Sequence, residues 1–298
     1  MIHQSFTCTE STRKCIDLFM ENYLSKGNFS PFDVSVFLNE VLPSTILSDL
    51  KKVGVGVKSV TIHSLFSSKN PKVGLLIHEA ISRFLCDLED IKYPYEEHKF
   101  LYPKGDGVNV AEWGNGYGVI SPHSDDLYET IDTDLLSLTV SKDETKSSTI
   151  IYDIDQVLNN FPADYLTDLL NMEFNYISGK NVNGRVITKK RTFREYKNNM
   201  SYYNIDLRKE AELGNRMYPV DKGNNYLVDE LRIALEKTAP LYSKGKTGTF
   251  IVISNREVLH GRGQLPKEDN TERLLFRSKG SKYLTPQVEK ELTLENQY

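Results

Sequence analysis

The sequence is poor in cysteine and has no long hydrophobic run. Its three cysteines, Cys8, Cys15 and Cys86, are odd in number and lack metal-ligand spacing, so they predict neither a disulfide framework nor a zinc knuckle. Reduced thiols of this kind are typical of cytoplasmic proteins. No apolar stretch approaches the roughly 20 residues of a membrane-spanning helix, and the N-terminal residues lack the apolar segment of a signal peptide. We therefore expect a cytoplasmic protein with no membrane partner.

An excess of charge of one sign is also missing. The 37 Lys and Arg residues are balanced by 41 Asp and Glu residues, which gives a net charge of -4. This mild acidity argues against a nucleic-acid partner. Apolar residues make up 39% of the chain and charged residues 26%, which is typical of a packed globular protein. No linker-like segment divides the chain, so we expect a single domain over residues 1–298, while the oligomeric state stays open.

Hydrophobic periodicity separates an N-terminal helical part from a β-rich remainder. Apolar residues recur at helical spacing within residues 1–100, which predicts a mainly helical N-terminal layer. Helices are also expected at 155–171 and 226–237. Apolar and alternating runs predict strands at 134–140, 148–153, 249–254 and 272–278. The β core therefore spans residues 100–171 and 226–280, and the polar, weakly periodic residues 172–225 between them are interpreted as an insertion that acts as a lid.

Two candidate metal ligands stand two residues apart in the segment His123-Ser124-Asp125. In an extended strand, residues i and i+2 face the same side, so both side chains could hold one ion. A second histidine from a distant strand would complete a set of two histidines and one carboxylate, which leaves positions open on Fe(II). The pair alone is a weak signal, because a histidine that caps a turn or pairs with the acid explains it equally well.

The C-terminal third of the chain supplies the remaining residues of such a site. The apolar run 249–254 leads to Asn255, and His260 follows after a turn. The next run carries Arg273 and Arg277, four residues apart. An arginine fork binds a carboxylate through two hydrogen bonds, and a cation in an otherwise apolar strand needs a partner. The pattern predicts a metal ligand followed by a binding site for a dicarboxylate.

These segments together resemble the Fe(II)/2-oxoglutarate-dependent oxygenases of the taurine dioxygenase and clavaminate synthase group. The resemblance covers residues 100–280 and rests on HSD at 123–125, STIIYD at 148–153, SNREVLHGRG at 254–263 and ERLLFRS at 272–278. It implies an α+β fold with a mainly β core, in which a double-stranded β-helix, or jelly roll, is flanked by N-terminal helices and a lid insertion.

The resemblance also implies the cofactors and the residues that hold them. Fe(II) would be bound by His123, Asp125 and His260. The cosubstrate 2-oxoglutarate would be held by Arg273 and Thr149, and O2 would be the oxidant. Arg277 would lie near 2-oxoglutarate or near the carboxylate of the substrate.

The implied reaction is hydroxylation of an unactivated C–H bond with release of succinate and CO2. Because the clavaminate synthase side of the group often acts on amino acids, we expect a small-molecule substrate, namely a free and rather basic amino acid. Asp126 and Glu112 are candidates for binding its amino group, although each is equally well explained as a solvated loop acid. Alternatives are a sulfonate or another small acid, a carrier-bound or peptide-bound residue, and a non-catalytic relative in which the same ligands hold a structural metal such as zinc.

Overall fold

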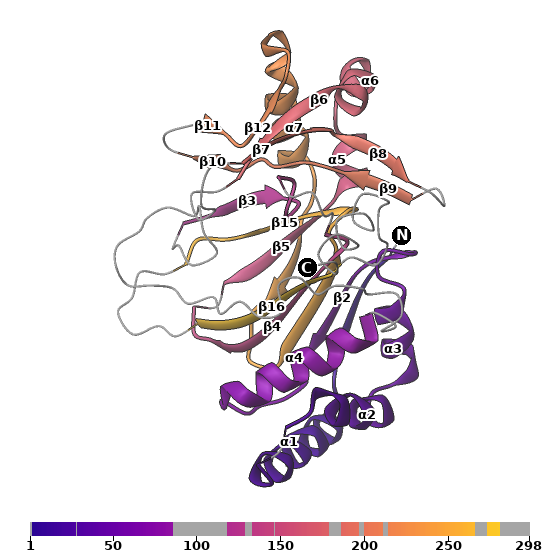
Figure 1. The fold of residues 1–298 in the computed structure, drawn as a ribbon, viewed down its shortest axis with the longest axis vertical. Helices are drawn as coiled ribbons and strands as arrows, with labels where there is room; N and C mark the ends of the chain where they lie inside the picture. Colours follow the sequence, from indigo (N-terminus) through magenta and orange to yellow (C-terminus); the bar gives the residue numbers. More distant parts are fainter. Residues whose placement is uncertain are drawn as a thin grey trace, which may run out of the picture.

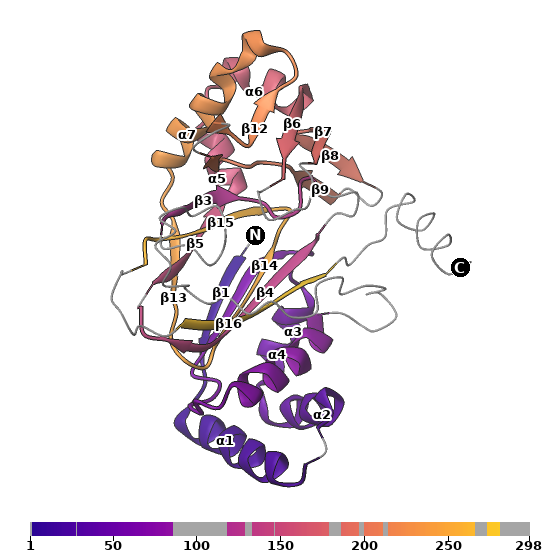
Figure 2. The same cartoon turned by 60° about the vertical axis from the view of Figure 1, so that its left-hand side comes forward.

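A computed structural model describes most of the chain and shows two β-sheets lying face to face, with helices outside them (Figure 1). The described residues are 2–27, 29–85, 118–128, 133–145, 147–178, 186–196, 200–210, 214–265 and 273–280. The view in Figure 2 separates a helical layer at one end from a mixed layer at the other. None of the described helices is long and apolar enough to cross a membrane.

The larger sheet has five strands and joins the two ends of the sequence. Its order is β1 (Ile2–Thr7), β2 (Val57–His63), β14 (Thr249–Ser254), β4 (Leu135–Asp143) and β16 (Arg273–Gly280). The β1 and β2 strands run parallel, and every other neighbouring pair is antiparallel. The two central strands, β14 and β4, read as apolar runs because both of their faces are covered.

The smaller sheet has four antiparallel strands and faces the larger one. Its order is β13 (Leu241–Lys244), β5 (Ser148–Asp153), β15 (Val258–Arg262) and β3 (Ile120–His123). An apolar cluster joins the two sheets and consists of Leu136, Ile151, Ile251, Ile253 and Val258. Since its members come from both sheets, their burial holds the sheets together as a sandwich.

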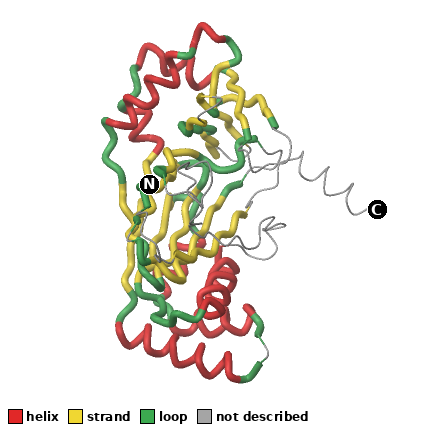
Figure 3. Tube along the Cα trace, turned by 90° about the vertical axis from the view of Figure 1, so that its left-hand side faces the viewer, coloured by secondary structure: helices red, strands yellow, loops and turns green. Residues whose placement is uncertain are grey.

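Four helices in the N-terminal part cover one side of the larger sheet (Figure 3). They are α1 (Glu10–Ser25), α2 (Pro31–Val41), α3 (Ser44–Lys51) and α4 (Pro71–Leu85). The α4 helix packs closely on β4 because Gly74 has no side chain; a Cβ atom there would lie 2.8 Å from Oγ of Ser141. The sequence predicts a mainly helical layer in this region, but β1 and β2 also lie in it. Burial on both faces gives β2 no alternation, and β1 is a polar edge strand.

A buried histidine fastens α4 to the larger sheet. Nδ1 of His78 lies 2.8 Å from Oγ1 of Thr139 on β4, and its Nε2 lies 2.7 Å from Oγ of Ser278 on β16. The imidazole is fully buried, and the two hydroxyl groups satisfy both of its nitrogens. This arrangement fixes β16 from the outer face, while the alternate residues of the same strand point to the other sheet.

The mixed layer lies beyond the smaller sheet (Figure 2). The sequence predicts one helix over 155–171, but the structure has two, because Pro162 lacks the N–H that would continue the first. The elements of this layer are α5 (Ile154–Asn159), α6 (Ala163–Asn171), β6 (Glu173–Ile177), β7 (Ile187–Arg191), β8 (Phe193–Tyr196), β9 (Met200–Tyr203), β10 (Lys209–Glu210), β11 (Gly214–Asn215), β12 (Met217–Pro219), η1 (Lys222–Asn224) and α7 (Tyr226–Glu236). The described residues within 172–225 thus form mainly short strands with buried side chains, including Phe174 and Tyr176.

Candidate metal centre

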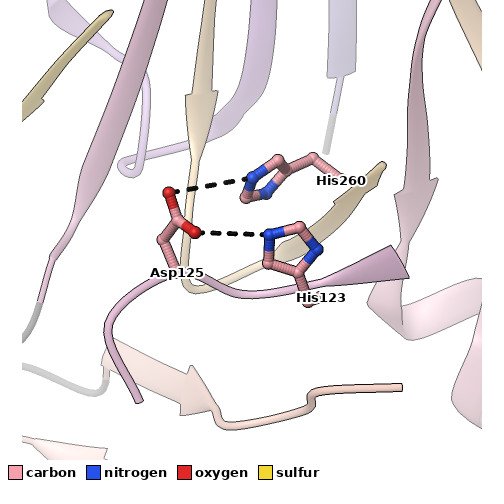
Figure 4. Close-up of side chains that lie close together, drawn as sticks. All are labelled: His123, Asp125 and His260. Atoms are coloured by element: carbon pink, nitrogen blue, oxygen red, sulfur yellow. Dashed lines mark ion pairs between the residues drawn. The ribbon is translucent and has the colours of Figure 1, made fainter. Parts of the chain in front are cut away.

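Two side chains that are close in sequence and one that is distant from them meet between the two sheets. His123, Asp125 and His260 each offer one ligand atom, and these atoms lie within 4.8 Å of one another. Nε2 of His123 lies 3.3 Å from Oδ1 of Asp125, and Nε2 of His260 lies 3.9 Å from Oδ2. Figure 4 shows both imidazole rings directed at the same carboxylate. All three residues are buried.

The sequence suggests that His123 and Asp125 lie on one strand, but the backbone places them differently. β3 ends at His123, and Asp125 lies in the bend that follows. Asn255 holds this bend: its Oδ1 accepts a hydrogen bond from the Asp125 amide at 2.8 Å, and its Nδ2 donates to the Asp125 carbonyl at 3.1 Å. On the neighbouring strand, His260 is the residue paired with His123. The third ligand is therefore a direct cross-strand neighbour of the first.

A glycine beside His260 permits the close approach of β15 to β3. A Cβ atom on Gly261 would lie 2.6 Å from the carbonyl oxygen of Ile120. Since that oxygen belongs to the backbone of β3, any side chain would push the two strands apart. The two histidines depend on this spacing, because each sits on one of these strands.

The protonation states favour binding of a cation. Nδ1 of His123 donates to the carbonyl of Ser121 at 2.8 Å, which leaves the Nε2 lone pair directed at the site. Burial lowers the pKa of His123, and burial together with the neighbouring His123 holds the pKa of His260 well below its usual range. Burial alone would raise the pKa of Asp125, but Lys279 and the histidines lower it well below its usual value. Two neutral imidazoles and one carboxylate form a donor set that fits Fe(II).

A cavity of about 100 Å³ opens beside the three ligands. Both sheets line it, since its walls include Thr149 from the smaller sheet and Leu136 and Leu138 from the larger one. Four arginines also line the cavity: Arg208, Arg262, Arg273 and Arg277. Such a mixture of apolar walls and converging charged groups is typical of a small-molecule site.

Arg273 lies in this cavity, as the dicarboxylate hypothesis requires. Together with Leu275 and Arg277, it faces the same side of β16, as alternate residues of a strand do. Nε of Arg273 donates to Oδ2 of Asp143 at 3.1 Å. Among the described residues, none accepts a hydrogen bond from its Nη1 or Nη2, so the outer edge of the guanidinium is available to a ligand.

A second arginine reinforces the positive charge at this end of the cavity. Arg262 is paired with Thr149 across β15 and β5, and its Nη2 donates to the carbonyl of Gly118 at 2.8 Å. Burial, together with the charge of Arg273, lowers the pKa of Arg262 to about 9. Arg262 and Arg273 thus both bring a buried guanidinium to the lining of the cavity. The sequence contains Arg262 in the HGR segment, but it gives no reason to place it beside Thr149.

The other expected site residues are distributed differently. Nη1 of Arg277 lies 3.4 Å from Oδ2 of Asp125, one of the candidate metal ligands. Asp126 does not line the cavity: its carboxylate accepts from Nζ of Lys279 at 2.6 Å and from Oγ1 of Thr133 at 2.5 Å. Its backbone has a φ of 61°, a left-handed conformation that aspartate tolerates. Glu112 lies outside the described residues.

Arg208 is a cavity residue to which sequence reasoning assigned no more than a place in the lid. The chain around it runs beside β3, since the amide of Ser124 donates to the carbonyl of Ile205 at 2.9 Å and that of Leu207 to the carbonyl of Pro122 at 3.2 Å. Asp206 is likewise bridged to His123. No sequence signal marks this contact, because the segment lacks periodicity and pairs with residues about 80 positions away.

Comparison with solved structures identifies proteins that share this fold. No protein-family model and no curated protein matches the sequence. Among solved structures, an asparagine oxygenase in complex with Fe(II), 3-hydroxyasparagine and succinate has a TM-score of 0.73 at 15% identity, over 92% of each chain. The non-heme iron oxygenase OrfP with Fe and α-ketoglutaric acid has a TM-score of 0.67 at 14% identity, over 94% of this chain and 95% of that one. The chain therefore has the mixed α/β, strand-rich fold of these non-heme iron oxygenases.

Proposed function

We propose that the protein is an Fe(II)- and 2-oxoglutarate-dependent dioxygenase that hydroxylates a small molecule. One observation carries the proposal: the cluster of His123, Asp125 and His260 shares a cavity with Arg273, whose guanidinium is paired with the buried Asp143. A structural zinc site needs the three ligands but has no use for a guanidinium beside them. A dicarboxylate cosubstrate accounts for both parts of the cavity.

The proposal includes the finer architecture that the sequence predicts. The two facing sheets are the two halves of a double-stranded β-helix, and residues 1–298 form one oxygenase domain. Residues 172–225 act as the lid, which is supported by the contact of Ile205 and Leu207 with the strand that carries His123. We further propose a cytoplasmic enzyme with a small-molecule substrate and no nucleic-acid or membrane partner.

Each residue of the centre has a definite task in this reaction. His123, Asp125 and His260 would hold Fe(II), and a set of two histidines and one carboxylate leaves positions on such a metal open to other ligands. When bound, the iron supplies the oxidising chemistry that yields succinate, CO2 and a hydroxylated product. Asn255 keeps Asp125 in place through the two hydrogen bonds to its backbone.

The remaining residues orient the cosubstrate and keep water out. Arg273 binds the distal carboxylate of 2-oxoglutarate with Thr149 nearby, and Asp143 fixes the direction of the guanidinium. Arg277 is positioned to contact 2-oxoglutarate or the substrate near the metal. Leu136 and Leu138 line the cavity with apolar surface, which reduces access of water.

A free amino acid is the substrate class we propose first. Support comes from the neighbours in fold, which hold 3-hydroxyasparagine and (3S)-hydroxy-L-Arg in their complexes. Glu112 remains a candidate for binding the amino group. For Asp126, the engagement with Lys279 and Thr133 supports a role in holding the bend around Asp125 rather than in contacting the substrate. A sulfonate, another small acid or a carrier-bound residue would use the same chemistry.

The test is formation of succinate by the purified protein with Fe(II), 2-oxoglutarate and air, screened across small molecules. Stimulated turnover that is lost in His123→Ala and in Asp125→Ala supports the proposal. The Arg273→Gln variant should keep its iron and lose affinity for 2-oxoglutarate, which separates the two halves of the site. Absence of 2-oxoglutarate binding by the iron-loaded protein contradicts the proposal and favours a structural metal.

A further inference from the structure

A buried lysine lies beside the bend that carries Asp125. Lys279 stands near the end of β16, where its backbone pairs with Leu136 of β4. Its side chain is only 6% exposed, and its contacts include both acids of the bend. Nζ of Lys279 donates to Oδ1 of Asp126 at 2.6 Å and lies 3.9 Å from Oδ2 of Asp125. Because a buried ammonium group is costly unless carboxylates compensate it, the positions of Lys279 and Asp126 depend on each other.

We infer that Lys279 is a positioning residue of the metal centre: its ion pair with Asp126 holds the bend in the orientation that directs Asp125 at the two histidines. This inference rests on the proposed function, since it requires that the three ligands bind a metal. Lys279 directly follows the ERLLFRS segment at 272–278 and is outside every segment that carries the resemblance to the oxygenases.

The backbone of Asp126 shows why the bend needs a fixed side chain. Its φ of 61° is a left-handed conformation, which a residue with a side chain adopts rarely and keeps only where its surroundings determine it. Two donors hold the carboxylate of Asp126, namely Nζ of Lys279 and, at 2.5 Å, Oγ1 of Thr133. Since Asp126 directly follows Asp125, contacts that fix the one also fix the direction of the other.

The bend is thus held in two ways, and both supports belong to the larger sheet. Asn255, which follows the end of β14, bonds to the backbone of Asp125, and its Nδ2 also donates to the carbonyl of Thr133 at 2.9 Å. Lys279 bonds to the next side chain from β16. The two histidines instead stand on β3 and β15 of the smaller sheet. The ion pair therefore fixes the acid ligand to one sheet at a set distance from the ligands on the other.

A second buried lysine allows positioning to be separated from stabilisation. The side chain of Lys58 is 2% exposed and forms ion pairs with Asp153 and Asp155, and it does not line the cavity. Its removal should lower the melting temperature through the loss of a buried ion pair. If Lys279 only stabilised the fold, its removal would have the same effect and no further one.

The experiment measures binding of Co(II) by the full-length protein after its metal has been removed. Co(II) is used because its visible absorption bands report both its affinity and the geometry of its ligands. Lys279→Gln and Asp126→Asn should each raise the Kd for Co(II) about tenfold or more, the usual effect of removing a residue that orients a metal ligand, and should shift the bands. Lys58→Gln should lower the melting temperature and leave the Kd and the bands unchanged.

The double variant shows whether Lys279 acts through Asp126. Combining Lys279→Gln with Asp126→Asn should weaken Co(II) binding no more than the more severe single variant, because both changes remove the same interaction. Losses that multiply in the double variant overturn the inference. Unchanged Co(II) binding in Lys279→Gln overturns it too, as does an equal loss of binding in Lys58→Gln at an equal fall in melting temperature. Asp126→Asn, which is nearly isosteric, decides between these outcomes if Lys279→Gln does not fold.

The wild-type protein keeps this inference apart from the proposed function. Failure of wild type to bind either Co(II) or Fe(II) contradicts the proposed function itself. Metal binding by wild type that Lys279→Gln and Asp126→Asn leave unchanged contradicts only the role of Lys279.

Discussion

Asp143 accepts a hydrogen bond from Nε of Arg273 at 3.1 Å across the pair of strands β4 and β16. The carboxylate is completely buried, and Thr145 also donates to it through its amide and its hydroxyl group. Asp143 therefore fixes the guanidinium that we propose binds 2-oxoglutarate, without lining the cavity itself. Removal of its charge should act on binding of the cosubstrate and leave the metal ligands in place.

We expect Asp143→Asn to weaken binding of 2-oxoglutarate about tenfold, since a charge-assisted hydrogen bond becomes a neutral one. Iron content should remain at the wild-type level, and kcat should change less than KM. Anaerobic calorimetry with 2-oxoglutarate measures the effect. The control is Glu144→Gln, which alters the half-exposed neighbour paired with Lys142. Unchanged affinity in Asp143→Asn would show that Arg273 does not depend on this acid.

The glycines of the HGRG segment provide a second prediction. Gly261→Ala should reduce the iron content of the purified protein to well below one per chain, because the new methyl group meets the carbonyl of Ile120 and separates the strands of the two histidines. Gly263→Ala is the control, since no atom of the described residues lies within 4 Å of a Cβ atom there. Metal analysis after reconstitution with Fe(II) is the measurement. Full iron content in Gly261→Ala would mean that the strands tolerate the methyl group.

The buried acid of the mixed layer should contribute strongly to stability. Asp206→Asn would leave Arg208 and Arg216 facing a neutral amide, and we expect the free energy of unfolding to fall by about 3 kcal/mol. The surface control Asp229→Asn, which breaks the pair with Arg232, should cost less than about 1 kcal/mol. Urea denaturation followed by circular dichroism compares the two variants.

The pKa of Asp206 determines how the difference in free energy of unfolding between wild type and Asp206→Asn depends on pH. Burial alone would raise this pKa, but Arg208 and Arg216 outweigh burial and lower it to about 2, against 3.8 for an ordinary aspartate. The unfolded chain therefore binds the proton more readily, and the ionised carboxylate stabilises the fold above pH 3.8. The gap between wild type and Asp206→Asn should be constant from pH 8 to pH 5 and shrink as the pH falls from 3.8 toward 2. A gap that widens in acid would contradict this sign.

The described cysteines should differ widely in reactivity. Burial raises the pKa of the Cys8 thiol to about 11, so only about one thiolate in a thousand is present at pH 8. Cys15 is exposed on α1. Iodoacetamide should therefore label Cys15 much faster than Cys8 at pH 8, as read by peptide mass spectrometry, which resolves Cys86 as well. Equal rates would indicate that β1 and the start of α1 open readily.

Local features of this chain could be predicted from the residues alone. The apolar runs 148–153 and 249–254 coincide with β5 and β14, because a short β-rich segment bounded by polar or turn residues has few alternatives. The three candidate metal ligands could also be nominated from the sequence, because histidine and aspartate are residue types that bind metals and they occur in the segments that carry the resemblance. The break at Pro162 could have been predicted from the same rules, since proline interrupts a helix wherever it stands in the interior.

The sequence by itself determined the positions of four strands of the two sheets, β4, β5, β14 and β16, and the residue types of the candidate metal centre. Only the tertiary structure decided which residues surround that centre. Arg208 forms an ion pair with Asp206, and Lys279 forms one with Asp126. Nothing in the sequence indicates that these charges compensate one another. In the tertiary structure Asp125 lies in a bend held by Asn255, and not on the same strand as His123 as the sequence suggests. Such contacts depend on how distant segments pack against one another, and local propensity carries no information about them.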